Sequence, residues 1–95
     1  MNKYEVMYII SSDTAEDKRE ELIAKFKAYV ESKGGVVEGI DKLGMKKLAY
    51  PINFRNEGFY VLMNISLPMP EVDAMSKLMT ITDGIVRHLF VKKNA

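Results

Sequence analysis

The chain has no cysteine and no tryptophan, a single histidine, and a formal net charge of only +1 over 95 residues. The lack of cysteine excludes a disulfide scaffold, a thiol nucleophile and any metal site built on thiolates. One imidazole excludes a histidine cluster for a metal. The near-neutral total gives no global mark of a nucleic-acid-binding protein. What remains is a small domain whose function depends on the order of its residues.

Long apolar runs are also missing from the sequence. The longest contain about five residues, far fewer than the ~20 that a membrane-spanning helix needs. The N-terminal segment MNKYEVMYII contains Glu5 and is followed by no small-residue cleavage site, which excludes a signal peptide. We therefore expect a cytoplasmic protein without a membrane partner. Its length predicts a single domain over residues 1–95, in which 92–95 form a short C-terminal tail.

Residues 3–35 predict a strand followed by a helix. Residues 3–10 alternate as a strand does, and one face carries Tyr4, Val6, Tyr8 and Ile10. Thr14 is the expected N-cap of the helix. The helix is recognised by an apolar stripe at helical spacing, made of Leu22, Ile23, Phe26, Tyr29 and Val30. Gly34-Gly35 ends it, because glycine adopts the left-handed conformation common at helix ends.

Residues 36–92 predict two strands, a helix and a last strand. Residues 36–52 form a long, irregular strand with bulges or bends at Gly39 and Gly44, and Pro51 places it at a sheet edge. The segment 53–58 (NFRNEG) is the expected turn, with Asn56 and Gly58 supplying the turn chemistry. Residues 58–67 form a central strand, a helix follows Pro68, and residues 85–92 form the last strand. The buried face of that strand is left open, because both of its faces are mostly apolar.

This order of elements predicts the fold. Two helices with one apolar stripe each cover only one face of a four-stranded sheet. The arrangement is the ferredoxin-like α+β sandwich, βαββαβ, with an antiparallel sheet in the order 4-1-3-2. The second face of the sheet stays uncovered and, with the edges, is available to partners. Met7 and Met45 are expected on that uncovered face.

Residues for catalysis are lacking. The serines have no GxSxG context, and His88 alone is more simply a packed or half-exposed strand residue. The carboxylates between residues 13 and 21 sit where a helix begins, so a solvated helix start explains them better than a metal site. Gly34-Gly35 is not followed by the residues of a phosphate-binding loop. We expect no enzyme, no cofactor, no metal and no small-molecule substrate.

The placement of charge is more informative than its sum. The acids gather at the start of the first helix, whereas the bases lie on strands and loops: Lys42, Lys46, Lys47, Arg55, Arg87, Lys92 and Lys93. A local positive surface binds phosphates even when the total charge is near zero. Tyr50 and Tyr60 are aromatic residues suited to stacking on bases. The plainer interpretation, solvated charge and packed tyrosines, stays open, and residues 58–65 lack the RNP-type sequence of an RNA-recognition sheet.

Four segments together resemble a known family. They are KYEVMYII at 3–10, GMKKLAYPI at 44–52, EGFYVLMNI at 57–65 and IVRHLFVK at 85–92. In this order and spacing they resemble bacterial small-subunit ribosomal protein six, over essentially the whole chain. The most specific segment is 44–52, with its glycine, its basic pair and the Leu-Ala-Tyr-x-Ile that follows.

The resemblance implies a function that the residues alone do not name. It implies a structural constituent of the small ribosomal subunit that pairs with small-subunit ribosomal protein eighteen and supports subunit assembly. The pair binds the central domain of the ribosomal RNA, in the platform. Lys46, Lys47 and Arg87 match basic positions of the family, and Tyr50 lies inside its most specific segment. Arg55, Lys92 and Lys93 are added as candidate contacts from charge placement alone.

The near-neutral total then predicts that the chain alone holds RNA weakly and needs its partner. Two other functions stay open. One is a dimeric ferredoxin-like regulatory domain that binds a small molecule, although the sequence supplies no set of converging polar groups. The other is a protein-interaction module that adds a strand at the edge formed by residues 36–52.

Overall fold

A computed structural model describes residues 2–52 and 55–93, with side chains for 2–47 and 57–93. The predicted order of elements is confirmed. The elements are β1 (Asn2–Ser11), α1 (Glu16–Ser32), β2 (Val36–Ile52), β3 (Arg55–Leu67), α2 (Met69–Ile81) and β4 (Ile85–Lys92).

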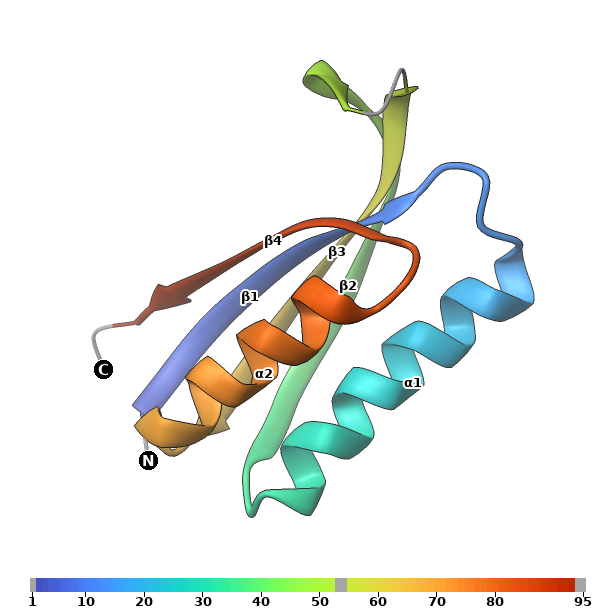
Figure 1. The fold of residues 1–95 in the computed structure, drawn as a ribbon. Helices are drawn as coiled ribbons and strands as arrows, with labels where there is room; N and C mark the ends of the chain where they lie inside the picture. Colours follow the sequence, from blue (N-terminus) through green and yellow to red (C-terminus); the bar gives the residue numbers. More distant parts are fainter. Residues whose placement is uncertain (1, 53–54, 94–95) are drawn as a thin grey trace.

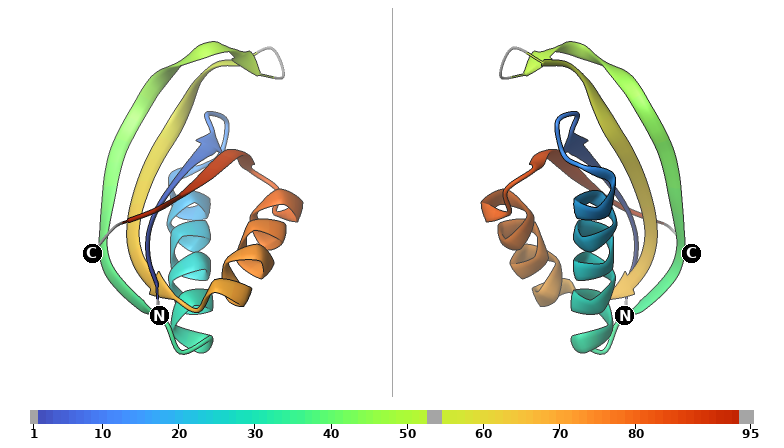
Figure 2. Two further views of the ribbon diagram at one scale, coloured as in Figure 1. Left: turned by 90° about the vertical axis from the view of Figure 1, so that its left-hand side faces the viewer. Right: turned by 90° about the vertical axis from the view of Figure 1, so that its right-hand side faces the viewer.

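The strands form one antiparallel sheet in the order β2-β3-β1-β4. This is the predicted order read from the opposite edge, and β2 lies at an edge as Pro51 suggested. Both helices lie on one face of the sheet, as Figures 1 and 2 show. The ferredoxin-like sandwich is therefore confirmed. The face of the sheet away from the helices is called the open face below.

The core lies between the helices and the sheet, because alternate strand residues point to opposite faces. Side chains from four elements are fully or almost fully buried there: Tyr4, Val6, Tyr8 and Ile10 of β1, Val61, Met63, Ile65 and Leu67 of β3, Ile23, Phe26 and Val30 of α1, and Met75 and Met79 of α2. Each such side chain contributes roughly 1.5–3 kcal/mol when it leaves water. The predicted face of β1 and the apolar stripe of α1 are confirmed.

The start of α1 differs from the prediction. Ala15, not Thr14, is the N-cap, and it forms no side-chain cap hydrogen bond. The backbone N–H of Thr14 instead donates to the carbonyl of Ser11 at 3.1 Å. This bond closes a turn after β1, so the chain enters the helix one residue later. Glu16 and Asp17 in the first turn stabilise the start of the helix in place of a cap, because their negative charges interact favourably with the positive end of the helix dipole.

The turn predicted over residues 53–58 is wrong from Arg55 onward. Asn56 and Gly58 are strand residues, because β3 begins at Arg55. The pairing of β1 with β3 stops at Ser11 and Gly58, whereas β2 and β3 are paired on to Lys47 and Glu57 and, after a shift of register, at Ile52 and Arg55. Continued cross-strand pairing has outweighed the local preference of Asn and Gly for turns. The extension, residues 46–52 and 55–58, is called the ribbon below, and it projects past the helices in Figure 2.

The bulges predicted at Gly39 and Gly44 are confirmed by shifts of register at Val37/Gly39 and Lys42/Gly44. Gly44 has a φ of 92°, a conformation that favours glycine. The second shift places Met45 opposite Phe59, on the side of the helices. The prediction that Met45 lies on the open face is therefore wrong, because a bulge resets the alternation of the strand. Met7 does lie on the open face, opposite Leu62 and Leu89.

Candidate nucleic-acid interface

Lys46 and Lys47 begin the β2 half of the ribbon and point to opposite faces. Lys46 is paired with Gly58, and Lys47 is paired with Glu57. Since Tyr60 and its even-numbered neighbours in β3 face away from the core, Lys46 lies on the open side and Lys47 on the helix side. Both side chains are exposed, and neither forms an ion pair with the residues that the structure describes. The two lysines are therefore free cations that do not form one patch.

The third lysine of the predicted basic cluster, Lys42, is neutralised within the chain. It is paired with Val61 and so leaves β2 on the side of the helices. Its ammonium group lies 2.7 Å from Oε1 of Glu20 on α1. The basic cluster that the sequence suggests on β2 is thus reduced to its last two members.

The bases of β4 and the residue after it are also divided between the two faces. Arg87 is exposed on the open face, opposite Ile9. Lys92 is the last residue of β4 rather than part of the tail, and it lies on the helix side, opposite Tyr4. Lys93 follows the strand, and its ammonium group hydrogen-bonds Asn64 and lies 3.6 Å from a carboxylate oxygen of Glu5. Arg87 is therefore the β4 base best placed on the open face.

Two candidates have only their backbones placed. Tyr50 belongs to the ribbon part of β2, and Arg55 begins β3. Their side chains lie outside the described residues, so their roles stay predictions.

The open face carries an apolar area that the sequence only partly suggested. It consists of Met7 and Ile9 of β1, Tyr60 and Leu62 of β3, and Leu89 and Val91 of β4. Leu89 is 53% and Val91 48% exposed. Met7, Tyr60 and Leu62 are partly buried, and Ile9 is buried. Exposed apolar surface next to such residues marks interaction sites. Because both faces of residues 85–92 are mostly apolar, the sequence did not predict which face Leu89 and Val91 occupy. Their pairing with β1 places them on the open face.

A polar strip borders this area at the end of the sheet away from the ribbon. Glu38 accepts a hydrogen bond from Ser66 at 3.0 Å and lies 3.7 Å from the ammonium group of Lys3. Together with the contacts of Lys93, these pairs leave that end nearly neutral. Lys46 and Lys47, which form no ion pair with the described residues, lie at the other end, in the ribbon.

His88 has a structural place between α2 and β4. Its Nε2 lies 2.8 Å from the hydroxyl oxygen of Ser76, and its ring meets Phe90 edge to face. Burial lowers the pKa of His88 below its usual value. Among the described residues, no three potential ligands gather to hold a metal ion, and no helix is both long and apolar enough to cross a membrane.

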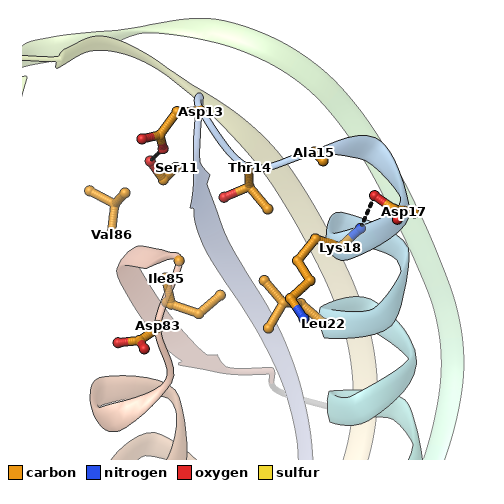
Figure 3. A pocket seen from close by; sticks show the side chains of 11 residues that line it. Ser11, Asp13, Thr14, Ala15, Asp17, Lys18, Leu22, Asp83, Ile85 and Val86 are labelled. Carbon is orange, nitrogen blue, oxygen red and sulfur yellow. Dashed lines mark hydrogen bonds between the residues drawn. The ribbon is translucent and has the colours of Figure 1, made fainter.

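One cleft opens where the β1–α1 loop meets the loop from α2 to β4 (Figure 3). Its lining includes Asp13, Asp17 and Asp83 and a single base, Lys18. The backbone N–H of Lys18 donates to the side chain of Asp17 at 2.9 Å. A lining with three carboxylates and one ammonium group disfavours an anionic ligand such as phosphate.

Comparison with known proteins gives consistent results. A family model described as Ribosomal protein S6 matches residues 3–92. The small ribosomal subunit protein bS6 of Desulforamulus reducens is 43% identical over 93 residues, 98% of each chain. That of Alkaliphilus metalliredigens is 41% identical over 92 residues, 97% of each.

Solved structures agree with these sequence comparisons. The crystal structure of 30S ribosomal protein S6 from Thermotoga maritima is similar with a TM-score of 0.91 and 27% identity, over 97% of this chain and 87% of that one. The Arabidopsis thaliana protein At3g17210 is similar with a TM-score of 0.57 at 11% identity, which supports the fold alone. The bacterial relatives are named as ribosomal proteins, which confirms the prediction that the chain is not an enzyme.

Proposed function

The chain belongs to the ribosomal protein S6 family, and from this we propose that it binds small-subunit ribosomal RNA as a structural constituent of that subunit. In the finer proposal, it binds the central domain, in the platform, together with small-subunit ribosomal protein eighteen. The match of the family model to residues 3–92 carries this proposal. Its place of action is then the ribosome in the cytoplasm.

The proposed RNA contact is electrostatic. Lysine and arginine neutralise phosphates and release counterions, so the affinity depends on salt and little on base sequence. Lys46 and Lys47 of the ribbon and Arg87 of β4 are the main candidates. Tyr50 and Arg55 also belong to the ribbon. Lys92 and Lys93 are weaker candidates, because one lies on the helix side and the other already contacts Glu5.

The proposed protein contact is apolar. Leu89, Val91 and Leu62 lie on the open face with no helix over them. A protein partner that covers them would gain the free energy of burying this surface and would add its own positive charge near the RNA. With a net charge of only +1, this chain gains much of its RNA affinity from such a pairing.

The test is a titration of a central-domain RNA fragment with this chain, with protein eighteen, and with both. We expect weak binding by this chain alone and much tighter binding by the pair, with an affinity that falls as salt rises. Tight binding by this chain alone would overturn the need for a partner. A free homodimer that does not bind the RNA would overturn the proposed RNA-binding function. It would favour the alternative function of a dimeric regulatory domain that binds a small molecule.

A further inference from the structure

Two glycines lie opposite Lys46 and Tyr60 at the ribbon end of the open face. Lys46 is paired with Gly58, and Tyr60 is paired with Gly44. Each long side chain therefore faces a residue without a side chain on the neighbouring strand. A Cβ built at Gly44 would meet no atom within 4 Å, so the space beside Tyr60 is open.

The pairing also fixes how Lys46 and Tyr60 stand relative to each other. They occupy diagonal positions on two neighbouring strands, where Cα atoms are roughly 7–8 Å apart. Tyr60 is half-buried and lies between Gly44 and Ile9. The aromatic ring of Tyr60 is thus a diagonal neighbour of the ammonium group of Lys46, which is carried on a flexible side chain.

Charge distinguishes the two sides of the ribbon. On the open side, Lys46 has no acid opposite it. On the helix side, Lys47 is opposite Glu57. The exposed acid Asp41 lies on the open face opposite Leu62, beyond Tyr60, so Lys46 is the charge of the ribbon that favours a phosphate on the open side.

We propose that Tyr60 and Lys46 together bind one unpaired nucleotide of RNA, with the base stacked on the Tyr60 ring and the phosphate paired with the Lys46 ammonium group. Proteins bind unpaired RNA in this manner, with an aromatic platform for the base and a cation for the backbone. This inference rests on the proposed RNA-binding function and adds to it a residue, Tyr60, that contacts a base. The apolar residues Leu89 and Val91, nearer the middle of the sheet, stay available to the protein partner.

The experiment compares full-length variants in their binding to a central-domain RNA fragment in the presence of protein eighteen. Tyr60→Phe keeps the ring and is expected to bind within twofold of the wild type. Tyr60→Leu keeps an apolar side chain but loses the ring, and its affinity is expected to fall about tenfold. Lys46→Gln is expected to weaken binding. It is also expected to reduce the slope of log affinity against log salt concentration by about one, as the loss of one phosphate contact does. Lys25→Gln, at an exposed lysine of α1, is the matched control and is expected to bind as the wild type does.

A second measurement does not depend on the folding of variants. Ultraviolet crosslinking of the wild-type complex, read by mass spectrometry, is expected to give an RNA adduct on Tyr60. Equal binding by Tyr60→Phe and Tyr60→Leu, with no adduct, would overturn the inference and leave the proposed function intact. So would a loss of protein-eighteen binding in Tyr60→Leu without loss of the RNA contact. Failure of the wild type to bind the RNA would instead overturn the proposed function.

Discussion

The ammonium group of Lys42 on β2 lies 2.7 Å from Oε1 and 2.8 Å from Oε2 of Glu20 on α1. This ion pair joins the edge strand to the first helix, close to the bulge at Gly44. It also removes one of three lysines from the basic stretch of β2. Lys46 and Lys47 come after the bulge, where α1 offers them no acid.

Lys42→Gln is accordingly expected to leave RNA binding within twofold of the wild type, because its charge is already neutralised by Glu20. Both side chains are about half exposed, so the loss of stability should stay below about 1 kcal/mol. The titration used for Lys46→Gln measures the first effect, and urea unfolding measures the second. A drop in affinity equal to that of Lys46→Gln would show that Lys42 leaves Glu20 to contact the RNA.

Gly35→Ala is expected to lower the free energy of unfolding by about 1–3 kcal/mol. A Cβ at this position would lie 2.5 Å from the carbonyl oxygen of Ser66 and 2.8 Å from a methyl group of Val30. The matched control is Gly39→Ala, where a Cβ would meet nothing within 4 Å. That change should be neutral or stabilising by up to about 1 kcal/mol. Equal urea midpoints for the two variants would disprove the close approach at Gly35.

Tyr8→Phe is expected to raise the free energy of unfolding by about 1 kcal/mol at pH 7. The Tyr8 side chain is fully buried, and its hydroxyl has no hydrogen-bond partner among the described residues. The ring itself packs edge to face on Phe26, with centroids 5.2 Å apart, and phenylalanine keeps that contact. Urea unfolding of both proteins checks this, and a clear loss of stability would show that the hydroxyl is bonded in solution.

The same variant should change the response to alkali. Burial, and to a lesser degree the Glu20 carboxylate, raises the pKa of Tyr8 well above its usual value. Above a pH of about 10 the unfolded chain loses this proton first, so the stability of the wild type falls as the pH rises. Tyr8→Phe lacks this contribution, and its advantage should widen from pH 9 to pH 11. An unchanged difference across that range would count against a buried, protonated hydroxyl.

His88→Gln is expected to flatten the acid side of the stability profile. Because burial lowers the pKa of His88 in the folded state, the unfolded chain takes up the proton first as the pH falls below about 6.5. Stability is therefore complete above that pH and decreases toward pH 5. Glutamine stays neutral and can still bond Ser76. The urea midpoints of both proteins at pH 7 and pH 5 give the comparison, and parallel losses would exclude a contribution from His88.

Much of the fold follows from patterns that act locally. The alternation of β1 and β3, the stripe through Phe26 and the bulges at Gly39 and Gly44 each depend on a few neighbouring residues. The predictions of the N-cap of α1 and of the turn after β2 were wrong for the same reason. A turn closed by Ser11 decides where α1 begins, and pairing between strands decides where β3 begins. Such contacts are invisible in a local pattern.

The candidate interface was harder to predict than the fold. Adjacent lysines in the sequence suggest one patch, but Lys46 and Lys47 leave the ribbon on opposite sides. The partner of Lys42 lies 22 residues away on another element. The open space beside Tyr60 depends on Gly44, which comes opposite to it only after a register shift. Assigning these faces requires the register of β2. The sequence predicts bulges at Gly39 and Gly44, but it does not show which face of the sheet the residues after each bulge take.

Chemical footprinting of assembled small subunits, with and without this chain, tests the central claim most directly. We predict that adding the chain together with protein eighteen protects nucleotides in the central domain of the ribosomal RNA, and that Lys46→Glu combined with Lys47→Glu weakens this protection while the chain still folds. An identical footprint in the presence and absence of the chain would contradict the account.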